Sequence, residues 1–237
     1  MGLSVFDILN GTMSIIYVII SILVGLKIAS RYIEKKQRVF LFVGLSWVGL
    51  SAPWFPSTLS FSLSFFSIQL PPEFLFTIAN VPISIALILW MTAFTDLKYR
   101  SKQKFIIGIL IIYALIYNSI FFYLLFTDST QIGKIEGLTD TSYKLIVNIN
   151  MILSLLILLI TGTIFSLESI KSDDREVNLK GKFLLAAFYF FIIGAVLDVL
   201  STISIWFLII GRIFLIIGAI EFYIGFILPK FIKNIVL

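Results

Sequence analysis

Long runs of apolar residues divide the chain into segments of helical length. Each run holds about 20 residues, the number a helix needs to cross the hydrocarbon layer of a bilayer. The runs lack the strict alternation of membrane β-strands, so helices are the predicted structure. We therefore predict an all-α membrane protein, a seven-transmembrane helix bundle that forms one domain over residues 1–237. The predicted spans are residues 10–31, 39–56, 74–95, 105–126, 145–166, 182–202 and 206–228.

The composition supports this prediction and excludes a soluble globular domain. Charged residues make up 13% of the chain, about half of the roughly 25% that soluble domains carry. Hydrophobic residues make up 59%, and no soluble core of this size could bury so many long apolar runs. The lipid bilayer is therefore the one partner that composition predicts.

Basic residues fall in alternate linkers, and this pattern predicts the direction of insertion. All but Lys134, Lys144 and Arg212 lie on one predicted side of the membrane. Because basic linkers stay in the cytoplasm, we expect the N-terminus outside and the C-terminus in the cytoplasm of a multi-pass cell-membrane protein. Topology thus explains the net charge of +5 without nucleic acid as a partner. The basic-side residues are Lys27, Arg31, Lys35, Lys36, Arg38, Lys98, Arg100, Lys102, Lys104, Lys171, Arg175, Lys180, Lys182, Lys230 and Lys233.

The longest outer linker, residues 52–73, is rich in apolar side chains. Its central part alternates Leu or Phe with Ser, which indicates a strand. The positions of Leu59, Leu63 and Phe66 fit a short interfacial helix equally well. In either form the linker is expected to cover the outer surface, as a lid over a pocket or as an interfacial anchor.

Two charged residues near the outer ends of the last two spans are predicted to form an ion pair. Asp198 and Arg212 lie about 7 Å and about 13 Å below the turn between these spans, counted at 1.5 Å per residue. An arginine side chain on the neighbouring antiparallel helix can bridge this difference in depth. Ionisable groups within a membrane are costly and mark functional or paired positions.

Glu221 lies deeper in the last span, on its cytoplasmic half. It lies beside a series of glycines, Gly211, Gly218 and Gly225, whose seven-residue spacing favours close helix packing. Lys27 in the first span is its best-placed partner, so we predict a second intramembrane charge pair, Lys27 with Glu221. The alternative is that Lys27 extends to the cytoplasmic surface.

Uncharged polar residues of the other spans lie at similar depth to the first pair. The residues expected to bind a ligand are Asn80, Ser84, Asn118, Asn150, Asp198 and Arg212. Polar groups that converge from five helices suggest an outward-facing polar cavity. The alternative is that each group only hydrogen-bonds a neighbouring helix.

The sequence contains no recognisable enzyme signature. It has neither histidine nor cysteine, which excludes the commonest ligands of zinc, copper and haem as well as thiol nucleophiles. The last span also lacks the lysine that a microbial rhodopsin uses to hold retinal. We therefore expect a protein without catalytic residues, metal or cofactor.

Two functions remain in competition. The first is a receptor or sensor that binds a small molecule or lipid headgroup in the outer cavity and acts through a separate cytoplasmic partner. The second is an ion or small-solute transporter or channel that uses Asp198, Arg212, Glu221 and Lys27. A transporter needs polar groups that reach both faces, whereas a receptor needs only the outer site. An accessory membrane subunit is a third alternative, and the sequence indicates no oligomeric state.

Overall fold

The computed structural model describes residues 3–236 and contains seven helical segments long and apolar enough to cross a membrane. All seven predicted spans are therefore confirmed as helices, which suggests a multi-pass membrane protein. The elements are α1 (Val5–Lys35), α2 (Arg38–Leu50), η1 (Ala52–Trp54), α3 (Phe55–Ser64), α4 (Pro72–Leu97), η2 (Arg100–Lys102), α5 (Gln103–Thr127), η3 (Ser129–Gln131), β1 (Gly133–Glu136), β2 (Asp140–Tyr143), α6 (Leu145–Ile170), α7 (Arg175–Val199), η4 (Leu200–Thr202), α8 (Ile205–Ile227) and α9 (Lys230–Val236).

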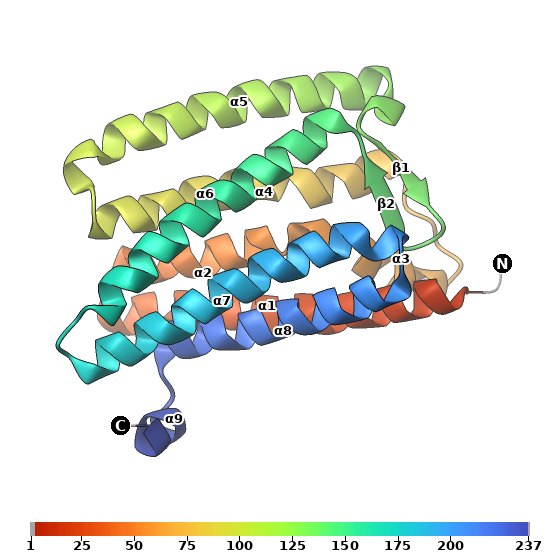
Figure 1. Cartoon of the computed structure of the whole chain (residues 1–237). Coiled ribbons are helices and arrows are strands. Elements are labelled where there is room, and N and C mark those ends of the chain that lie inside the picture. Colours follow the sequence, from red (N-terminus) through yellow and green to blue (C-terminus); the bar gives the residue numbers. More distant parts are fainter. Residues whose placement is uncertain (1–2, 237) are drawn as a thin grey trace.

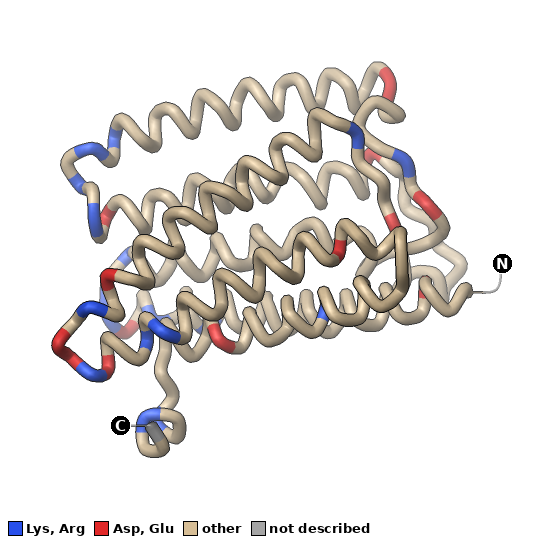
Figure 2. The backbone as a smooth tube through the Cα atoms, viewed as in Figure 1, with Lys and Arg blue, Asp and Glu red and all other residues tan. Residues whose placement is uncertain are grey.

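The bundle has two chemically different ends, which we name the hairpin end and the basic end. The hairpin end carries the start of α1 and the two-stranded hairpin β1–β2 (Figure 1). The basic end carries the linkers α1–α2, α4–α5 and α6–α7 together with α9. Figure 2 shows that Lys and Arg gather at the basic end. The charge asymmetry of the sequence is therefore an asymmetry of the folded bundle.

The second span is longer than the apolar run predicts. After α2 ends at Leu50, the chain continues through η1 into α3 and leaves the bundle only after Ser64. The linker over residues 52–73 thus forms a short helix, and the alternative of a strand is wrong. The helix packs against α1, where the ring of Phe61 occupies the space that a side chain at Gly11 would need.

Six of the long helices form a closed ring, and α5 lies outside it. Around the ring, α1 packs against α2 and α8, α2 against α4, α4 against α6, α6 against α7, and α7 against α8. Helix α5 packs mainly on α4, and only 17% of its apolar segment is buried inside the protein. Figure 1 shows α5 and α6 diverging from the hairpin end toward the basic end.

Glycines bring α7 and α8 into close contact, as their spacing predicts. A Cβ on Gly211 would lie 3.0 Å from the carbonyl oxygen of Gly194 on α7. A Cβ on Gly218 would lie 3.2 Å from the carbonyl oxygen of Ala187. Side chains at these positions would push the helices apart, so the glycines set the separation that lets Asp198 and Arg212 meet.

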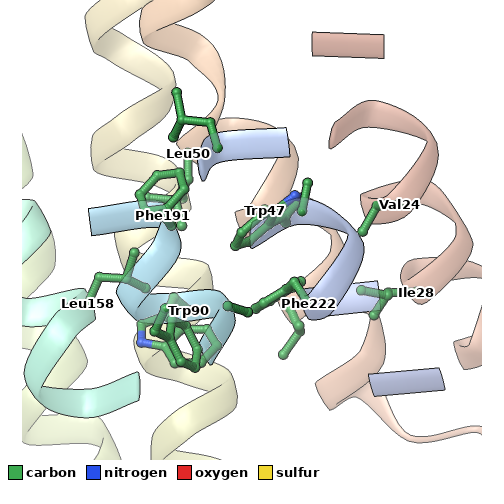
Figure 3. Packing of buried hydrophobic residues seen from close by; sticks show 14 of the residues in the cluster. Val24, Ile28, Trp47, Leu50, Trp90, Leu158, Phe191 and Phe222 are labelled. Atoms are coloured by element: carbon green, nitrogen blue, oxygen red, sulfur yellow. The ribbon is translucent and has the colours of Figure 1, made fainter. Parts of the chain in front are cut away.

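Aromatic side chains fill the middle of the ring (Figure 3). Trp47 stacks on Phe222 with 3.8 Å between ring centroids, and Phe188 lies edge-on to Phe222 at 5.8 Å. Trp90 continues the layer, 5.2 Å from Phe188. These rings belong to one hydrophobic cluster to which all six helices of the ring contribute.

The hairpin between α5 and α6 is an element that the apolar runs do not predict. Its strands pair antiparallel from Gly133 with Tyr143 to Glu136 with Asp140. Gly137 begins the turn with φ 65°, a left-handed conformation that favours glycine over residues with a side chain. The turn lies beside Asp7 at the start of α1, so the hairpin reaches across the end of the ring.

Candidate functional site

All the predicted ligand-binding residues except Asn118 lie in two separate groups at the hairpin end. Asp198 and Arg212 belong to the first, which we name the charged cluster: Asn10, Tyr17, Trp54, Asp198 and Arg212. Asn80, Ser84 and Asn150 belong to the second, which we name the neutral polar cluster: Asn80, Ser84, Tyr113, Tyr117 and Asn150. The charged cluster comes from α1, η1, α7 and α8, and the neutral polar cluster from α4, α5 and α6.

The predicted ion pair between Asp198 and Arg212 is confirmed. An Arg212 Nη2 atom lies 3.2 Å from Asp198 Oδ1. The arginine is only 2% exposed, whereas the aspartate side chain is 22% exposed. A guanidinium so deeply buried needs a nearby opposite charge, because an unpaired charge in a medium of low dielectric constant is very costly.

Two neutral residues hold this ion pair in place. Arg212 Nη2 donates a hydrogen bond of 2.6 Å to Asn10 Oδ1. Trp54 Nε1 donates one of 2.8 Å to Asp198 Oδ2, and its ring lies under the guanidinium with 5.7 Å to the ring centroid. Tyr17 packs edge-on against the same indole at 4.8 Å. The cluster therefore ties α1 and η1 to the α7–α8 pair.

The turn of the hairpin covers the charged cluster. Asn10 Nδ2 donates to the backbone oxygen of Thr139 at 3.0 Å, and Ser57 Oγ donates to the same oxygen at 2.6 Å. Asp7 Oδ1 accepts from the backbone N–H of Leu138 and from the Thr139 hydroxyl, both at 3.2 Å. The turn thus lies on α1 and α3, and Thr139 is 3% exposed.

The charged cluster retains hydrogen-bonding capacity that no side chain or backbone group of the described protein uses. Arg212 Nε and Nη1 have no hydrogen-bond partner, and neither has the Tyr17 hydroxyl. Tyr17 is completely buried. An unused donor in a buried site costs about 1–3 kcal/mol, so these three groups are candidate contacts for a bound polar molecule.

The hairpin adds a carboxyl group whose protonation responds to this environment. Partial burial raises the pKa of Asp140 above its usual range, with a further contribution from the negative charge of Asp198. The backbone N–H of Thr141 donates a hydrogen bond of 2.9 Å to Asp140 Oδ1, and this bond partly offsets the rise in the pKa. The turn that covers the ion pair therefore carries a group that takes up a proton more readily than an exposed aspartate.

The neutral polar cluster is joined by fewer hydrogen bonds. The Tyr113 hydroxyl donates to Asn150 Oδ1 at 2.9 Å, which ties α5 to α6. Asn150 Nδ2, the Tyr117 hydroxyl and the Ser84 hydroxyl are buried without a partner. Three donors thus remain unused on three helices, and no charged side chain belongs to the cluster.

The other predicted asparagines bond mainly within their own helices. Asn80 Nδ2 donates to the backbone oxygen of Phe76 at 2.8 Å, and Asn118 Nδ2 donates to that of Ala114 at 2.8 Å. The Oδ1 atoms of both residues are buried without a partner. Asn80 also lies beside Tyr143 of the hairpin, and burial raises the pKa of this tyrosine.

The predicted pair of Lys27 and Glu221 is wrong. No ion pair joins these two described residues: Lys27 lies on the exposed surface of α1, and Glu221 Oε2 is buried without a hydrogen-bond partner. Adjacent helices were expected to bring the two residues together, and α1 and α8 are adjacent. The two side chains nevertheless do not meet, because adjacency fixes a neighbour but not the rotation of each helix.

Sequence reasoning missed three residues of the charged cluster, Asn10, Tyr17 and Trp54, and also Thr139 of the turn that covers it. A signal for two of them is present in the sequence. Polar residues recur along the first span at Asn10, Ser14, Tyr17 and Ser21, the spacing of one helix face, and all four are buried. Trp54 and Thr139 lie outside the apolar runs, and no comparable pattern marks them.

No protein-family model matches the chain, and neither a curated protein nor a solved structure shows significant similarity to it.

Proposed function

We propose that the protein is a non-enzymatic, receptor-like protein of the cell membrane, with its hairpin end outside. In this proposal a small polar molecule or lipid headgroup binds at the charged cluster. Movement of the hairpin turn admits the ligand, and the basic end passes the change to a separate cytoplasmic partner. The observation that carries the proposal is the buried Arg212 with its two unused donor atoms.

The chemistry of the cluster suits a ligand with an acceptor group. Arg212 Nε and Nη1 and the Tyr17 hydroxyl can all donate hydrogen bonds, and hydrogen bonds from a charged donor are about twice as strong as neutral ones. The pairing of Arg212 with Asp198 leaves little net charge. A molecule with a carboxylate, phosphate or carbonyl oxygen therefore fits better than a cation.

The middle of the ring favours a receptor over a transporter. Arg212 and Glu221 are nine residues apart, about 14 Å along α8. Phe222, which follows Glu221 in the chain, stacks on Trp47 within the hydrophobic cluster that fills the middle of the ring. A polar path through the ring would have to displace these stacked side chains, whereas a ligand at the hairpin end would not.

The orientation can be tested by cysteine labelling, because the chain has no cysteine of its own. Ser142→Cys places a thiol on the exposed surface of the hairpin, and Ser101→Cys places one at the exposed basic end. With a membrane-impermeant maleimide on intact cells, Ser142→Cys should react at once and Ser101→Cys only after lysis. The reverse result would place the hairpin end in the cytoplasm and remove the outward-facing site.

Ligand binding can be tested by thermal unfolding of the purified protein with a panel of small carboxylates, phosphates and zwitterionic headgroups. A ligand of the charged cluster should raise the melting temperature of the wild type. It should raise that of Tyr17→Phe much less. This variant removes only a hydroxyl that has no partner in the structure, so a loss of binding cannot be ascribed to a broken internal contact.

Tyr117→Phe is the matched control, because it removes an equally unpartnered hydroxyl from the neutral polar cluster. It should keep the full ligand shift. If Tyr17→Phe and wild type respond equally to every compound, the unused donors of the charged cluster bind nothing from the panel. The accessory-subunit alternative would then be preferred.

The transporter alternative rests on one observation, the buried and unpartnered Oε2 atom of Glu221. Under this alternative Glu221→Gln should abolish solute or ion flux into proteoliposomes. Under the receptor proposal it should leave ligand binding unchanged. Flux that the wild type shows and the variant loses would replace the receptor proposal.

A further inference from the structure

An apolar cleft of about 300 Å³ lies between α4, α5 and α6. Two of its lining residues, Ile109 and Ile160, are more than half exposed. The cleft therefore opens on the side of the bundle. Because the three helices are candidate membrane spans, its mouth faces the hydrocarbon layer. The lining residues are Met91, Ile106, Ile109, Leu110, Ile157, Ile160 and Thr161.

The cleft and the neutral polar cluster lie on the same faces of the same three helices. On α6, Asn150 precedes Ile157 by seven residues, almost two full turns. On α4, Ser84 precedes Met91 by the same interval, and on α5 Tyr113 follows Leu110 by one turn. The polar groups therefore lie closer to the hairpin end than the cleft does. On α4 and α6 the distance along the helix axis from the polar residue to the cleft residue is about 10 Å.

The polar groups above the cleft are uncharged and mainly donors. Asn150 Nδ2, the Tyr117 hydroxyl and the Ser84 hydroxyl have no partner, and the three residues are at most 6% exposed. A ligand with hydroxyl or ester oxygens would accept their hydrogen bonds. A carboxylate or phosphate there would be buried without a cation, which is unfavourable.

We propose that the cleft and the neutral polar cluster form one site for a neutral amphiphile with an oxygen-bearing headgroup and a hydrocarbon chain, such as a monoacylglycerol. The headgroup binds among Ser84, Tyr117 and Asn150, and the chain lies in the cleft. The ligand enters sideways from the bilayer between α5 and α6. The volume is at the lower end of the range of about 300–1,000 Å³ for ligand sites, as expected for a single chain.

Packing around α5 is consistent with such an entry. Helix α5 packs mainly on α4, and its hydrogen bond to α6 from Tyr113 lies above the cleft. Below that bond, Trp90 Nε1 donates to Thr161 Oγ1 at 2.8 Å. This bond satisfies the one polar side chain among the lining residues, so the cleft itself is suited to hydrocarbon.

The site can be tested with 1-monooleoylglycerol that carries a photoreactive diazirine in its chain. The full-length protein in phosphatidylcholine nanodiscs is titrated with this probe, irradiated and digested. Labelling of peptides from α5 and α6 should saturate at a low molar fraction of probe. The matching diazirine fatty acid, kept ionised at alkaline pH, should label them at least about tenfold less than the monoacylglycerol probe at the same pH.

Two pairs of variants separate the site from lipid that merely surrounds the protein. Ile160→Trp fills the mouth of the cleft and should reduce labelling about tenfold. Ile152→Trp is its control, since Ile152 is also exposed on α6 but lies about 80° around the helix and away from the cleft. It should label like the wild type.

Tyr117→Phe removes one donor to the headgroup and should weaken binding about five- to tenfold, the effect of one hydrogen bond. Tyr17→Phe, in the charged cluster, should have no effect. If labelling rises linearly with the probe concentration and is equal in all four variants, the probe occupies only the lipid that surrounds the protein. This result would overturn the proposal. If the fatty acid labels these peptides as strongly as the monoacylglycerol does, the site does not select a neutral headgroup, and that part of the proposal is wrong.

This inference does not depend on the proposed receptor function, because it concerns different residues. The reciprocal variants keep the two apart. Of these two variants, only Tyr117→Phe should weaken binding of the monoacylglycerol, and only Tyr17→Phe should weaken binding of the proposed receptor ligand.

Discussion

The charged cluster and the neutral polar cluster lie at the same end of the bundle, yet they are built differently. In the charged cluster, each charged or amide group bonds across to another segment, so that α1, η1, α7, α8 and the hairpin turn are joined. In the neutral polar cluster one hydrogen bond joins two helices. Buried polar atoms without a partner remain in both clusters. The hairpin covers the first, whereas the second adjoins a cleft open to the side of the bundle.

The difference follows from the cost of burying charge. Opposite charges inside a bundle must compensate each other, since each uncompensated ion is penalised by several kcal/mol. A neutral hydroxyl or amide costs less when unpaired. The two charges are therefore fixed to each other and to neighbouring segments, although Arg212 keeps two unused donor atoms. The neutral groups are held by a single hydrogen bond between helices.

The largest expected effect comes from breaking the ion pair. Asp198→Leu leaves the Arg212 charge buried and unpaired and should lower the free energy of unfolding by about 3 kcal/mol. The double variant Asp198→Leu with Arg212→Met should recover most of this loss, because no charge is then buried. Unfolding in detergent, followed by circular dichroism, measures both. A double variant no more stable than the single one would contradict a role for charge compensation.

A smaller effect is expected for the indole that holds the aspartate. Trp54→Phe removes the hydrogen bond to Asp198 and should cost about 1.5–2 kcal/mol beyond the loss of packing, since the acceptor is charged. Trp47→Phe is the matched control, because Trp47 is equally buried and its Nε1 has no partner. Equal destabilisation of the two variants would show that the hydrogen bond contributes nothing.

The hydrogen bond of the neutral polar cluster should contribute less. Tyr113→Phe removes the donor to Asn150 and should cost about 0.6 kcal/mol, the average for hydrogen bonds between membrane helices. Tyr117→Phe should be neutral or slightly stabilising, because its hydroxyl has no partner to lose. The same unfolding measurement compares them, and a Tyr113→Phe cost equal to that of Asp198→Leu would remove the distinction between the clusters.

The smallest effect concerns pH. Since burial raises the pKa of Asp140 above the ordinary value of 3.8, the folded protein binds a proton more tightly than the unfolded chain. Stability from this group is therefore present at acid pH and is lost as pH rises through the raised pKa. Asp140→Asn should flatten this dependence. An unchanged pH profile of the melting temperature in the variant would show that Asp140 does not contribute.

The sequence by itself determined the positions and depth of the helices. Apolar runs marked all seven spans, and residue counting placed Asn80, Asn150, Asp198 and Arg212 near one end of the bundle. Residue counting also predicted the ion pair between Asp198 and Arg212, which the structure contains. That pair was predictable because a short turn joins α7 and α8, so the two helices are neighbours by connectivity, and the glycines between them were visible as a pattern.

Only the tertiary structure decided how polar groups at one depth are divided between two clusters. It also decided that Lys27 is exposed and does not pair with Glu221, that the linker after α2 continues as helix, and that the hairpin turn covers the charged cluster. The physical reason is that lipid tails are as apolar as a leucine core. Hydrophobicity therefore reveals that a residue lies within the membrane, but not whether it faces lipid, as on most of α5, or a neighbouring helix.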